Sequence, residues 1–307
     1  MDTLKTYTFS DLEKWDFSGT ALAVVGQPIE HSLSPAMHNA WIRSLSAKDP
    51  SFANWAYFRF EIPPELLSEA LNYFYKQGFL GINLTVPHKV MALDCVYDCS
   101  ETARRMGAIN TLKWMPHGYR GYNTDGYGLE MGIQKAFGKA FEGANVLISG
   151  AGGAARAAVV QALQKGARSI YIRNRSKERL NAMVDNLKDL KGFDRIQCLA
   201  VEDIEDSLDA LPLEGIYINA TSLGLKSGDA LPLDLTALPP KWVVYDMIYN
   251  PKQTDLTRLA LEQNRQQATG LGMLVHQGAR AFELWSENSV DAGIMEAAAE
   301  HALDTNY

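Results

Sequence analysis

The chain has 307 residues, of which 47% are hydrophobic and 21% are charged, and its formal net charge is −7. This composition is that of a folded globular protein with room for two domains, and it excludes a disordered or fibrous chain. An acidic chain without clustered Lys and Arg is not expected to bind nucleic acid, and no apolar run approaches the roughly 18 residues of a membrane span.

The N-terminal stretch MDTLKTYTFSDLEKW is polar and acidic and lacks the basic-then-apolar order of a signal peptide. We therefore expect a cytoplasmic protein. Cys95 and Cys99 stand four positions apart and Cys198 is remote, which gives an odd count without zinc-type spacing. The cysteines predict neither a disulfide framework nor a metal site, and we expect them to fill the core.

The first half of the chain alternates strands and helices with some irregularity. Trp15 and Phe17 predict that residues 1–18 pack on the protein and do not form a free tail. The predicted elements are strands at 20–26, 53–62 and 79–86, helices at 34–45 and 64–78, and a hairpin-like pair at 109–115 and 117–123. The helix at 34–45 is expected to have Ser34 at its cap and Pro35 at its first position.

The second half alternates more regularly, after a boundary near residue 125. Its predicted helices are 125–138, 154–167 and 177–190, and its predicted strands are 144–149, 168–173, 195–200, 215–220 and 242–247. Short apolar runs bounded by turn residues are typical of a parallel sheet with both faces covered. The sequence therefore predicts an α/β protein, with an N-terminal α/β domain followed by a doubly wound domain of the Rossmann type.

The stretch SGAGGAARAA (149–158) joins a predicted strand to a predicted helix. Its glycines, Gly150, Gly152 and Gly153, permit a tight turn and let a pyrophosphate approach the backbone. The start of the helix supplies N–H groups and the positive end of the helix dipole. In this context the pattern GxGGxA predicts a dinucleotide-binding site, in preference to a tight turn without a ligand.

About 20 residues further on, an NAD-binding domain usually places an acid on the ribose. Here the sequence reads RNRSKER (173–179), and the first acid comes late in this segment. Asn174, Arg175 and Ser176 offer a guanidinium and small polar groups, which suit a 2′-phosphate. The alternative is that Arg173 and Arg175 only face solvent at a strand end. We interpret the segment as favouring NADP over NAD.

Polar residues at the ends of apolar runs are candidates for a substrate site. The stretch GQPIEHSLSPAMHN (26–39) places Ser32 and Ser34 two apart, so on an extended segment both hydroxyls point the same way and can hold a carboxylate together. The other candidates are Asn83, Thr85, Lys89, Asn110, Asp125 and Gln277. Taken singly, each has a plainer interpretation as a cap, a turn residue or a solvated surface group.

Nine motifs occur along the chain in the order GxPIxHSxSPxxHN, NxTxPHK, GAxNT, GxNTDG, GAGGAARA, NRS, NATSxG, DxxYNPxxT and GxxMLxxQxxxAFxxW. Their order and spacing resemble those of the shikimate dehydrogenase family, which are NADP-dependent oxidoreductases of chorismate and aromatic amino-acid biosynthesis. The resemblance extends from about Gly26 to Trp285, and the N-terminal extension lies outside it. It implies reversible reduction of 3-dehydroshikimate to shikimate with NADPH, and it leaves open whether the protein is a monomer or a homodimer.

The resemblance also implies a role for each matching residue. Lys89 matches the catalytic lysine and Asp125 its partner. The residues that match substrate-binding groups are Ser32, Ser34, Asn83, Thr85, Asn110, Tyr249 and Gln277. The residues that match the cofactor contacts are Gly150, Ala151, Gly152, Gly153, Ala154, Asn174, Arg175, Ser176 and Arg179, with Thr221, Met247, Gly270 and Met273 at the nicotinamide. Ser176 stands where many relatives have Thr, which keeps the hydroxyl.

In this reaction negative charge grows on the ketone oxygen, so a lysine ammonium aimed at that oxygen stabilises the charge and can deliver the proton. Pro87 fixes the corner that presents Lys89. The sequence does not decide which of Lys89 and Asp125 carries the proton. The resemblance further implies that the chain after residue 270 packs on the first domain. It thus predicts a substrate domain of 1–124 and 270–307 and an NADP-binding domain of 125–269.

Three alternative functions compete with this interpretation. An acid near Arg175 would favour a quinate/shikimate dehydrogenase that uses NAD, and loss of the Lys89–Asp125 pair would favour a non-catalytic relative that binds pathway metabolites. The two serines speak against a folate-linked dehydrogenase of related architecture. Relatives that accept quinate well often carry Thr at the second serine, so Ser34 predicts a preference for shikimate.

Overall fold

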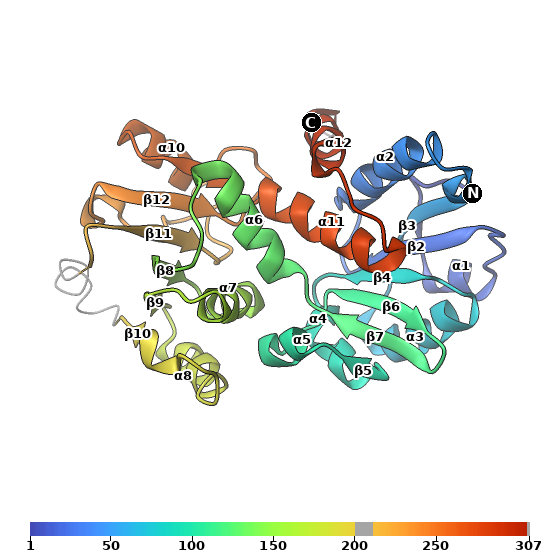
Figure 1. Ribbon diagram of the computed structural model, residues 1–307, viewed down its shortest axis with the longest axis horizontal. Helices are drawn as coiled ribbons and strands as arrows, with labels where there is room; N and C mark the ends of the chain where they lie inside the picture. The colour runs from blue at the N-terminus through green and yellow to red at the C-terminus, as the bar shows by residue number, and fades with distance from the viewer. Residues whose placement is uncertain (200–210, 306–307) are drawn as a thin grey trace. The chain divides into compact units, whose positions relative to one another are not determined.

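Two units make up the computed structural model, which describes residues 1–199 and 211–305. The first unit contains Met1–Thr124 and Gln277–Tyr307, and the second contains Asp125–His276 (Figure 1). Near the C-terminus the division falls inside one helix, α11 (Leu271–Ser286), whereas the sequence placed it at residue 270. The helix runs without interruption past the division, so the chain has no loop there to mark a boundary.

The first unit is built on a seven-stranded mixed sheet with the order β1-β3-β2-β4-β6-β7-β5. The strands are β1 (Thr6–Tyr7), β2 (Thr20–Gly26), β3 (Trp55–Glu61), β4 (Gly81–Leu84), β5 (Asp98–Cys99), β6 (Thr111–Met115) and β7 (Gly118–Tyr122). Strands β1 to β4 are parallel, and β6 is antiparallel to both β4 and β7. The predicted hairpin is therefore present as β6 and β7.

The helices of this unit include two from the C-terminal part of the chain. They are α1 (Phe9–Glu13), α2 (Ser34–Ser46), α3 (Leu67–Lys76), α4 (His88–Met91), α5 (Glu101–Met106), the later part of α11 and α12 (Ala292–Thr305), with short 3₁₀ helices η1 (Pro50–Phe52), η2 (Pro64–Leu66) and η3 (Ala92–Asp94). The expected capping of α2 by Ser34 is wrong. Ser34 is the first helical residue, Leu33 occupies the cap position, and the Ser34 N–H faces the Ser32 hydroxyl at 3.4 Å. Pro35 has no N–H to be capped.

The two faces of the first sheet are used differently. On one face, Phe58 and Phe60 of β3 lie in the hydrophobic core with Leu71 and Phe74 of α3. Because side chains alternate along a strand, Tyr57 and Asn83 lie on the other face, and both are buried. That second face carries the polar groups described below.

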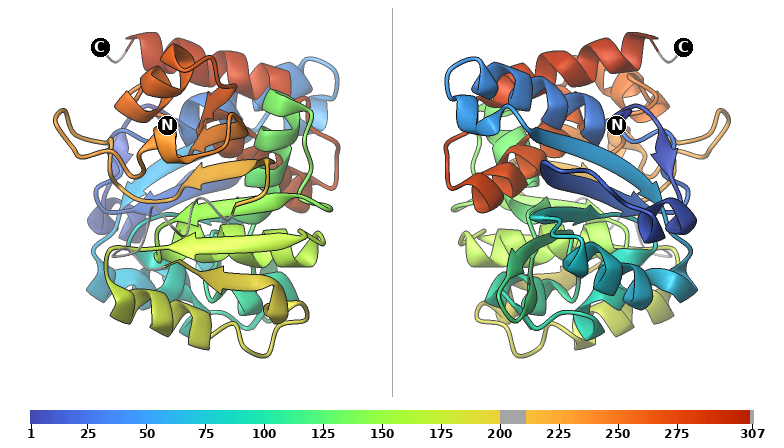
Figure 2. Two further views of the ribbon diagram at one scale, coloured as in Figure 1. Left: turned by 90° about the vertical axis from the view of Figure 1, so that its left-hand side faces the viewer. Right: turned by 90° about the vertical axis from the view of Figure 1, so that its right-hand side faces the viewer.

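The second unit contains a six-stranded, all-parallel sheet with the order β10-β9-β8-β11-β12-β13, whose strands run side by side in the left-hand view of Figure 2. The strands are β8 (Asn145–Ser149), β9 (Ser169–Arg173), β10 (Ile196–Cys198), β11 (Glu214–Asn219), β12 (Lys241–Asp246) and β13 (Gln267–Thr269). The helices are α6 (Asp125–Phe137), α7 (Gly153–Gln164), α8 (Lys177–Asp185) and α10 (Asp255–Glu262). Two short 3₁₀ helices, η4 (Phe193–Arg195) and η5 (Leu235–Ala237), also belong to this unit. This strand order is that of the doubly wound dinucleotide-binding fold, which confirms the predicted fold class.

Both faces of the second sheet are buried. Leu147, Tyr217 and Val244 pack with Leu256 of α10, and residues of alternate position such as Ile148 are buried as well. Continuous apolar strands are the expected result of covering both faces. Residue 200 of the strand predicted at 195–200 lies outside the described residues.

Two further expectations bear on the surface of the protein. The core position expected for Cys198 is wrong, because this residue lies on the edge strand β10 and is exposed, while Cys95 and Cys99 are half-buried. Among the described residues, no helix combines the length and the apolar character needed to cross a membrane.

Candidate active site

Lys89 stands on a one-turn helix, α4, directly after the corner that follows β4. The neighbouring His88 is fully buried, and its Nε2 lies 2.8 Å from the Ile62 carbonyl oxygen. The Ile109 N–H donates to the Lys89 carbonyl at 2.7 Å. Burial lowers the pKa of His88, so this side chain is neutral at neutral pH and serves as an anchor. The backbone of Lys89 is thus fixed from two sides.

Asn83 is held by three groups of the protein. Its Nδ2 donates to the Asn110 carbonyl at 3.2 Å and to Thr111 Oγ1 at 3.1 Å, and its Oδ1 accepts from the Tyr57 phenol at 2.8 Å. Both amide hydrogens are therefore engaged, and the remaining capacity is one lone pair on Oδ1. At this position a ligand hydroxyl can only act as the donor.

Asn110 links residues from distant parts of the chain and is 1% exposed. Its Oδ1 accepts from the Thr124 N–H at 2.8 Å, and its Nδ2 donates to Thr124 Oγ1 at 2.9 Å and to Gln277 Oε1 at 3.2 Å. Gln277 belongs to α11, far along the chain. The structure thus brings the predicted residues Asn83, Asn110 and Gln277 into one hydrogen-bonded network.

Tyr57, which no sequence motif indicates, extends this network toward Ser34. Burial raises the pKa of the Tyr57 phenol well above its usual value, an effect that a hydrogen bond with the Ser34 side chain partly offsets. Ser34 is buried, Ser32 is half-buried, and Thr85 follows β4 with its N–H bonded to the Val25 carbonyl at 3.0 Å. An aromatic residue in a strand gave no sign of this polar role.

His38 lies against Tyr57 on the same face of the sheet. The two rings stack in parallel, with centroids 4.2 Å apart and an angle of 4° between their planes. Within the described part of the chain, neither ring nitrogen of His38 has a hydrogen-bond partner. Complete burial lowers the pKa of His38 to about 3, so the imidazole is neutral. The neutral His38 ring thus packs in parallel against the ring of Tyr57.

Asp125 and Tyr249 belong to the second unit. Asp125 is the first residue of α6 and is 8% exposed, and Tyr249 follows β12, where burial raises the pKa of its phenol. Lys89 belongs to the first unit. The pairing of Lys89 with Asp125, and the grouping of Tyr249 with the first-unit residues, stay predictions.

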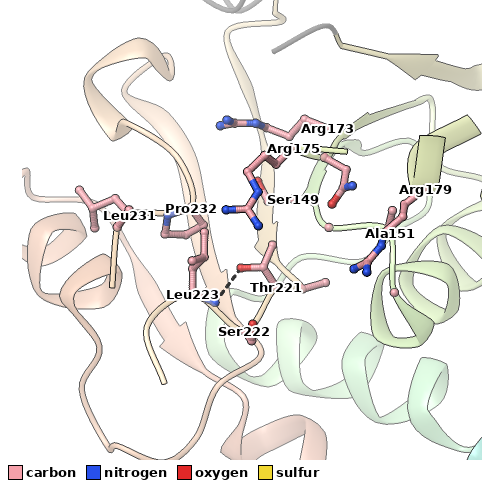
Figure 3. Close-up of a pocket in the computed structure, with 15 residues that line it drawn as sticks. Ser149, Ala151, Arg173, Arg175, Arg179, Thr221, Ser222, Leu223, Leu231 and Pro232 are labelled. Atoms are coloured by element: carbon pink, nitrogen blue, oxygen red, sulfur yellow. Dashed lines mark hydrogen bonds between the residues drawn. The ribbon is translucent and has the colours of Figure 1, made fainter. Parts of the chain in front are cut away.

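A cavity of about 530 Å³ lies at the carboxyl ends of β8, β9 and β11 (Figure 3). It is lined by Ser149, Gly150, Ala151, Gly152, Arg173, Asn174, Arg175, Arg179, Ala220, Thr221, Ser222, Leu223, Ala230, Leu231 and Pro232. Strands β8 and β11 are neighbours from the two halves of the sheet, so the cavity occupies the switch point where ligands bind in doubly wound folds. Gly153, Ala154 and Ser176 are not among the lining residues.

Glycine occurs in the turn after β8 for two different reasons. Gly150 has φ +124°, and a Cβ there would lie 2.8 Å from the Ala220 carbonyl oxygen, so only glycine fits. At Gly152 and Gly153 a Cβ would meet no atom of the described residues within 4 Å. Packing inside the protein therefore does not demand glycine at these two positions. They leave the start of α7 open to a ligand.

Arginines supply the positive charge of this cavity. Arg173 and Arg175 extend from the end of β9, and Arg179 lies in the first turn of α8 (Figure 3). Arg173, for which the sequence offered only a solvated position at a strand end, has a buried Nη1 without a hydrogen-bond partner among the described residues, and burial lowers its pKa. The Ser176 hydroxyl caps α8 by accepting from the Arg179 N–H at 3.2 Å.

The residues predicted at the nicotinamide gather at the carboxyl ends of β11, β12 and β13. The Met247 N–H donates to the Asn219 carbonyl at 3.0 Å, and the Thr221 hydroxyl donates to Asn219 Oδ1 at 2.7 Å. A Cβ at Gly270 would lie 2.0 Å from the Met247 carbonyl oxygen, so glycine is required there. The Met273 N–H donates to the Tyr245 hydroxyl at 3.0 Å.

A buried carboxylate supports this end of the sheet. Asp246 accepts from Asn219 Nδ2 at 3.0 Å, from the Ile248 N–H at 3.1 Å and from the Thr254 hydroxyl at 2.7 Å. Burial raises the pKa of Asp246, and these hydrogen bonds oppose the rise. The Asn of the motif NATSxG thus bonds to the Asp of DxxYNPxxT, which bonds in turn to the Thr of that motif, a connection that the sequence alone does not indicate.

A doubly wound sheet with a glycine-lined, arginine-rich cavity at its switch point defines a Rossmann-type protein of the dinucleotide-binding class. Three family models match the chain: the shikimate dehydrogenase substrate binding domain at residues 24–112, shikimate / quinate 5-dehydrogenase at 133–221, and the shikimate 5'-dehydrogenase C-terminal domain at 270–300. The chain belongs to the shikimate dehydrogenase family, so the family predicted from the motifs is confirmed.

Relatives match over nearly the whole chain. A shikimate dehydrogenase (NADP(+)) from Magnetococcus marinus is 36% identical over 279 residues, which cover 90% of this chain and 93% of the relative. The crystal structure of a shikimate dehydrogenase in complex with NADP+ has a TM-score of 0.82 at 31% identity and covers 94% of this chain and 97% of its own. The crystal structure of the Thermus thermophilus enzyme in complex with NADP(H) and shikimate has a TM-score of 0.78 at 32% identity. It covers 92% of this chain and 99% of its own.

Proposed function

We propose that the chain catalyses the reversible reduction of 3-dehydroshikimate to shikimate with NADPH. The observation that carries this proposal is the polar network of the first unit. Residues from four separate motifs, Ser34, Asn83, Asn110 and Gln277, meet on one face of the sheet, linked through Tyr57 and Thr124. A small polyhydroxylated acid needs this combination of hydroxyl and amide groups.

We assign each part of the substrate to groups in or near this network. The hydroxyls of Ser32 and Ser34 bind the carboxylate. The free lone pair of Asn83 accepts from one ring hydroxyl, and Thr85, Asn110 and Gln277 bind the others. We also assign Tyr249 to the substrate, by the resemblance of its motif.

Lys89 and Asp125 carry the proton chemistry. Bound NADPH supplies the hydride that reduces the ring ketone. The Lys89 ammonium stabilises the negative charge that develops on the ketone oxygen and delivers a proton to it, and the neutral amine takes that proton back in the reverse reaction. Asp125 orients the lysine and accepts a hydrogen bond from the ring. The fixed backbone of Lys89 supports this role, because a catalytic group must be held in place.

NADP fits the residues that the second unit presents. The turn Gly150 to Ala154 leaves space at the start of α7 for the pyrophosphate, whose charge the N–H groups of the helix stabilise. The 2′-phosphate is bound by Asn174, Arg175, Ser176 and Arg179. The nicotinamide is bound beside Thr221, Met247, Gly270 and Met273. The arginines of the cavity and the absence of an acid from its described lining support NADP over NAD.

The test is direct conversion by the purified chain. With 3-dehydroshikimate and NADPH, we expect one shikimate formed for each NADPH consumed, and the reverse with shikimate and NADP. The Lys89→Met variant, prepared in the same way, controls for contaminating enzyme. If wild-type protein forms no shikimate while it binds NADPH, the proposed substrate is wrong.

A further inference from the structure

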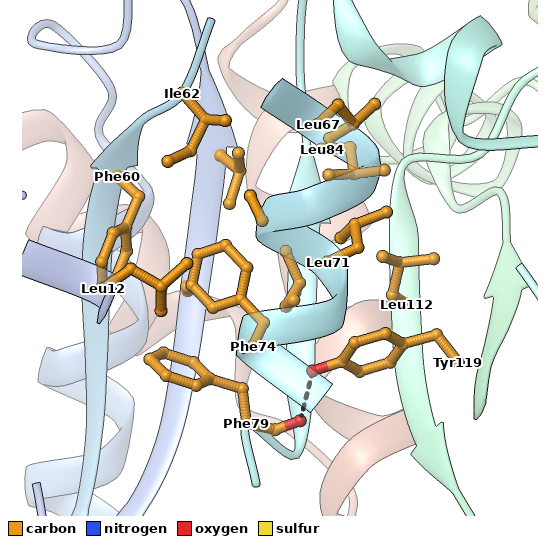
Figure 4. Packing of buried hydrophobic residues seen from close by; sticks show 14 of the residues in the cluster. Leu12, Phe60, Ile62, Leu67, Leu71, Phe74, Phe79, Leu84, Leu112 and Tyr119 are labelled. Carbon is orange, nitrogen blue, oxygen red and sulfur yellow. Dashed lines mark hydrogen bonds between the residues drawn. The ribbon is translucent and has the colours of Figure 1, made fainter. Parts of the chain in front are cut away.

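Residues 1–17 precede the family match, which begins at residue 24, and they add an edge to the first sheet. Strand β1 pairs in parallel with β3, with Thr6 opposite Arg59. Behind it, Leu12 is fully buried and lies among Phe60, Phe74 and Phe79 (Figure 4). The extension is therefore an integral part of the first unit.

One arginine joins this extension to the loop that carries the serines. Arg59 lies on β3, and its Nη2 donates to the Leu4 carbonyl of the extension at 2.9 Å. Its Nη1 donates to the Glu30 carbonyl, in the loop between β2 and α2. Hydrogen bonds from a charged donor are stronger than neutral ones. A single half-buried guanidinium thus bridges two segments that do not adjoin in the sequence.

The loop of residues 27–33 is buried at two points and exposed between them. Ile29 and Leu33 are buried and anchor it from within, whereas Glu30 and His31 are exposed. The Ser32 N–H donates to the Ile29 carbonyl at 3.0 Å, which closes the turn around Glu30. The position of this turn therefore sets the position of the Ser32 hydroxyl. The Ser32 hydroxyl in turn faces the Ser34 N–H, which is the first N–H of α2.

We propose that the extension of residues 1–17, acting through Arg59, holds the 27–33 loop in the conformation in which Ser32 and Ser34 receive the carboxylate of the substrate. This inference rests on the proposed function. Arg59 is a positioning residue, because it acts through the backbone of the loop. A loop ordered in advance spares the substrate the cost of ordering it on binding, so the benefit falls on affinity.

The kinetic test compares Arg59→Met, Arg59→Lys and the control Arg120→Met. Arg120 lies on β7 of the same sheet and pairs with Asp98, away from the loop. We expect Arg59→Met to raise the KM for shikimate about five- to tenfold, which is less than the roughly tenfold or more for a charge-assisted hydrogen bond made directly to a ligand, because Arg59 acts only through the loop. The value of kcat and the KM for NADP should change by less than about twofold. Arg59→Lys should restore part of the affinity, because an ammonium can still reach one carbonyl, and Arg120→Met should leave all three constants unchanged.

Hydrogen exchange of the free protein tests the same link without a substrate. In Arg59→Met, amides of residues 27–34 and 1–8 should exchange faster, while those of the second unit keep their wild-type rates. This result would stand even if the enzyme reduced another compound. Unchanged exchange in the 27–34 loop, or a general rise across the first unit with a matching loss of kcat, would overturn the proposal. Should Arg59→Met fail to fold, the same criteria apply to Arg59→Lys.

Discussion

The polar groups of the two units differ in how far the protein itself supplies their hydrogen-bond partners. In the first unit, Asn83 and Asn110 are buried and nearly saturated with hydrogen bonds from the protein itself. In the second, the cavity after β9 holds arginines, and Arg173 has a buried nitrogen without a partner among the described residues. The first arrangement is rigid before a ligand arrives, and the second has charge to be neutralised.

The difference follows from what each unit would bind. A small ring with hydroxyls is distinguished by direction, so the groups that meet it must be fixed by their neighbours. A phosphate is recognised mainly by charge, so cations in an open cavity suffice. We therefore expect mutations in the first unit to affect turnover, substrate affinity or stability, and mutations in the cavity to affect cofactor affinity and selectivity.

The largest effect is expected at Lys89. Lys89→Met should lower kcat by roughly a hundredfold or more, because it removes both the proton donor and the charge that stabilises the transition state. Steady-state kinetics with shikimate and NADP measure this effect. Lys113→Met is the control, since the Lys113 ammonium pairs with Glu287 at 2.9 Å. A Lys89 variant with near-normal turnover would remove this residue from the mechanism.

Arg175→Ala should weaken NADP binding about ten- to hundredfold and leave NAD almost unchanged, because only NADP carries the 2′-phosphate. Titration of each cofactor gives the dissociation constants. Arg168→Ala is the control, since Arg168 precedes the amino end of β9, away from the cavity. Equal weakening of both cofactors would make Arg175 a structural residue.

His38 should make the first unit sensitive to acid. Its folded-state pKa is about 3, whereas an unfolded histidine titrates near 6.5, so below the latter value only the unfolded state gains the proton. Between pH 7 and pH 5 the wild-type protein should lose about 2 kcal/mol of unfolding free energy through this group. Urea unfolding at both pH values measures the loss. His38→Phe keeps a ring against Tyr57, and in this variant the loss of unfolding free energy between pH 7 and pH 5 should be smaller by about 2 kcal/mol. An equal loss in the variant and the wild-type protein would show that His38 is not the titrating group.

The smallest effect is expected at Tyr57. Tyr57→Phe leaves the buried Asn83 Oδ1 without its donor and should cost about 1 kcal/mol of unfolding free energy, together with a rise in the KM for shikimate. Tyr75→Phe removes a hydroxyl that bonds the Met115 carbonyl at 2.9 Å, outside the network. The control should lose stability without a change in KM. If Tyr57→Phe leaves KM unchanged too, the network does not position Asn83 for the substrate.

The sequence predicted most of the fold because parallel strands covered on both faces form short apolar runs that alternate with helices. It missed β1, β5 and β13, which have only two or three residues each and depend on a neighbouring strand. The cap assigned to Ser34 was wrong because the residue type favours capping, whereas Pro35 and the Ser32 hydroxyl alter the local requirement.

The sequence predicted the roles of site residues only where the motifs indicated them. Gln277 was placed with Asn110 by resemblance, and the hydrogen bond between them supplies the physical reason. Tyr57, His38 and Asp246 were missed because their roles arise from burial and from partners elsewhere in the chain. Arg59 gave no signal, since a lone arginine in a strand is most simply a solvated residue.

The central claim is that the first unit is built for shikimate and the second for NADP. The most direct test is kcat/KM of the purified chain with shikimate and with quinate, each with NADP and with NAD. Quinate carries an additional hydroxyl on a tetrahedral carbon, for which the two serines offer no partner, so its use should be weaker by up to about a hundredfold. Replacing NADP by NAD should cost about ten- to hundredfold. The account predicts that shikimate with NADP is the best of the four combinations, and equal or better use of quinate or of NAD would contradict it.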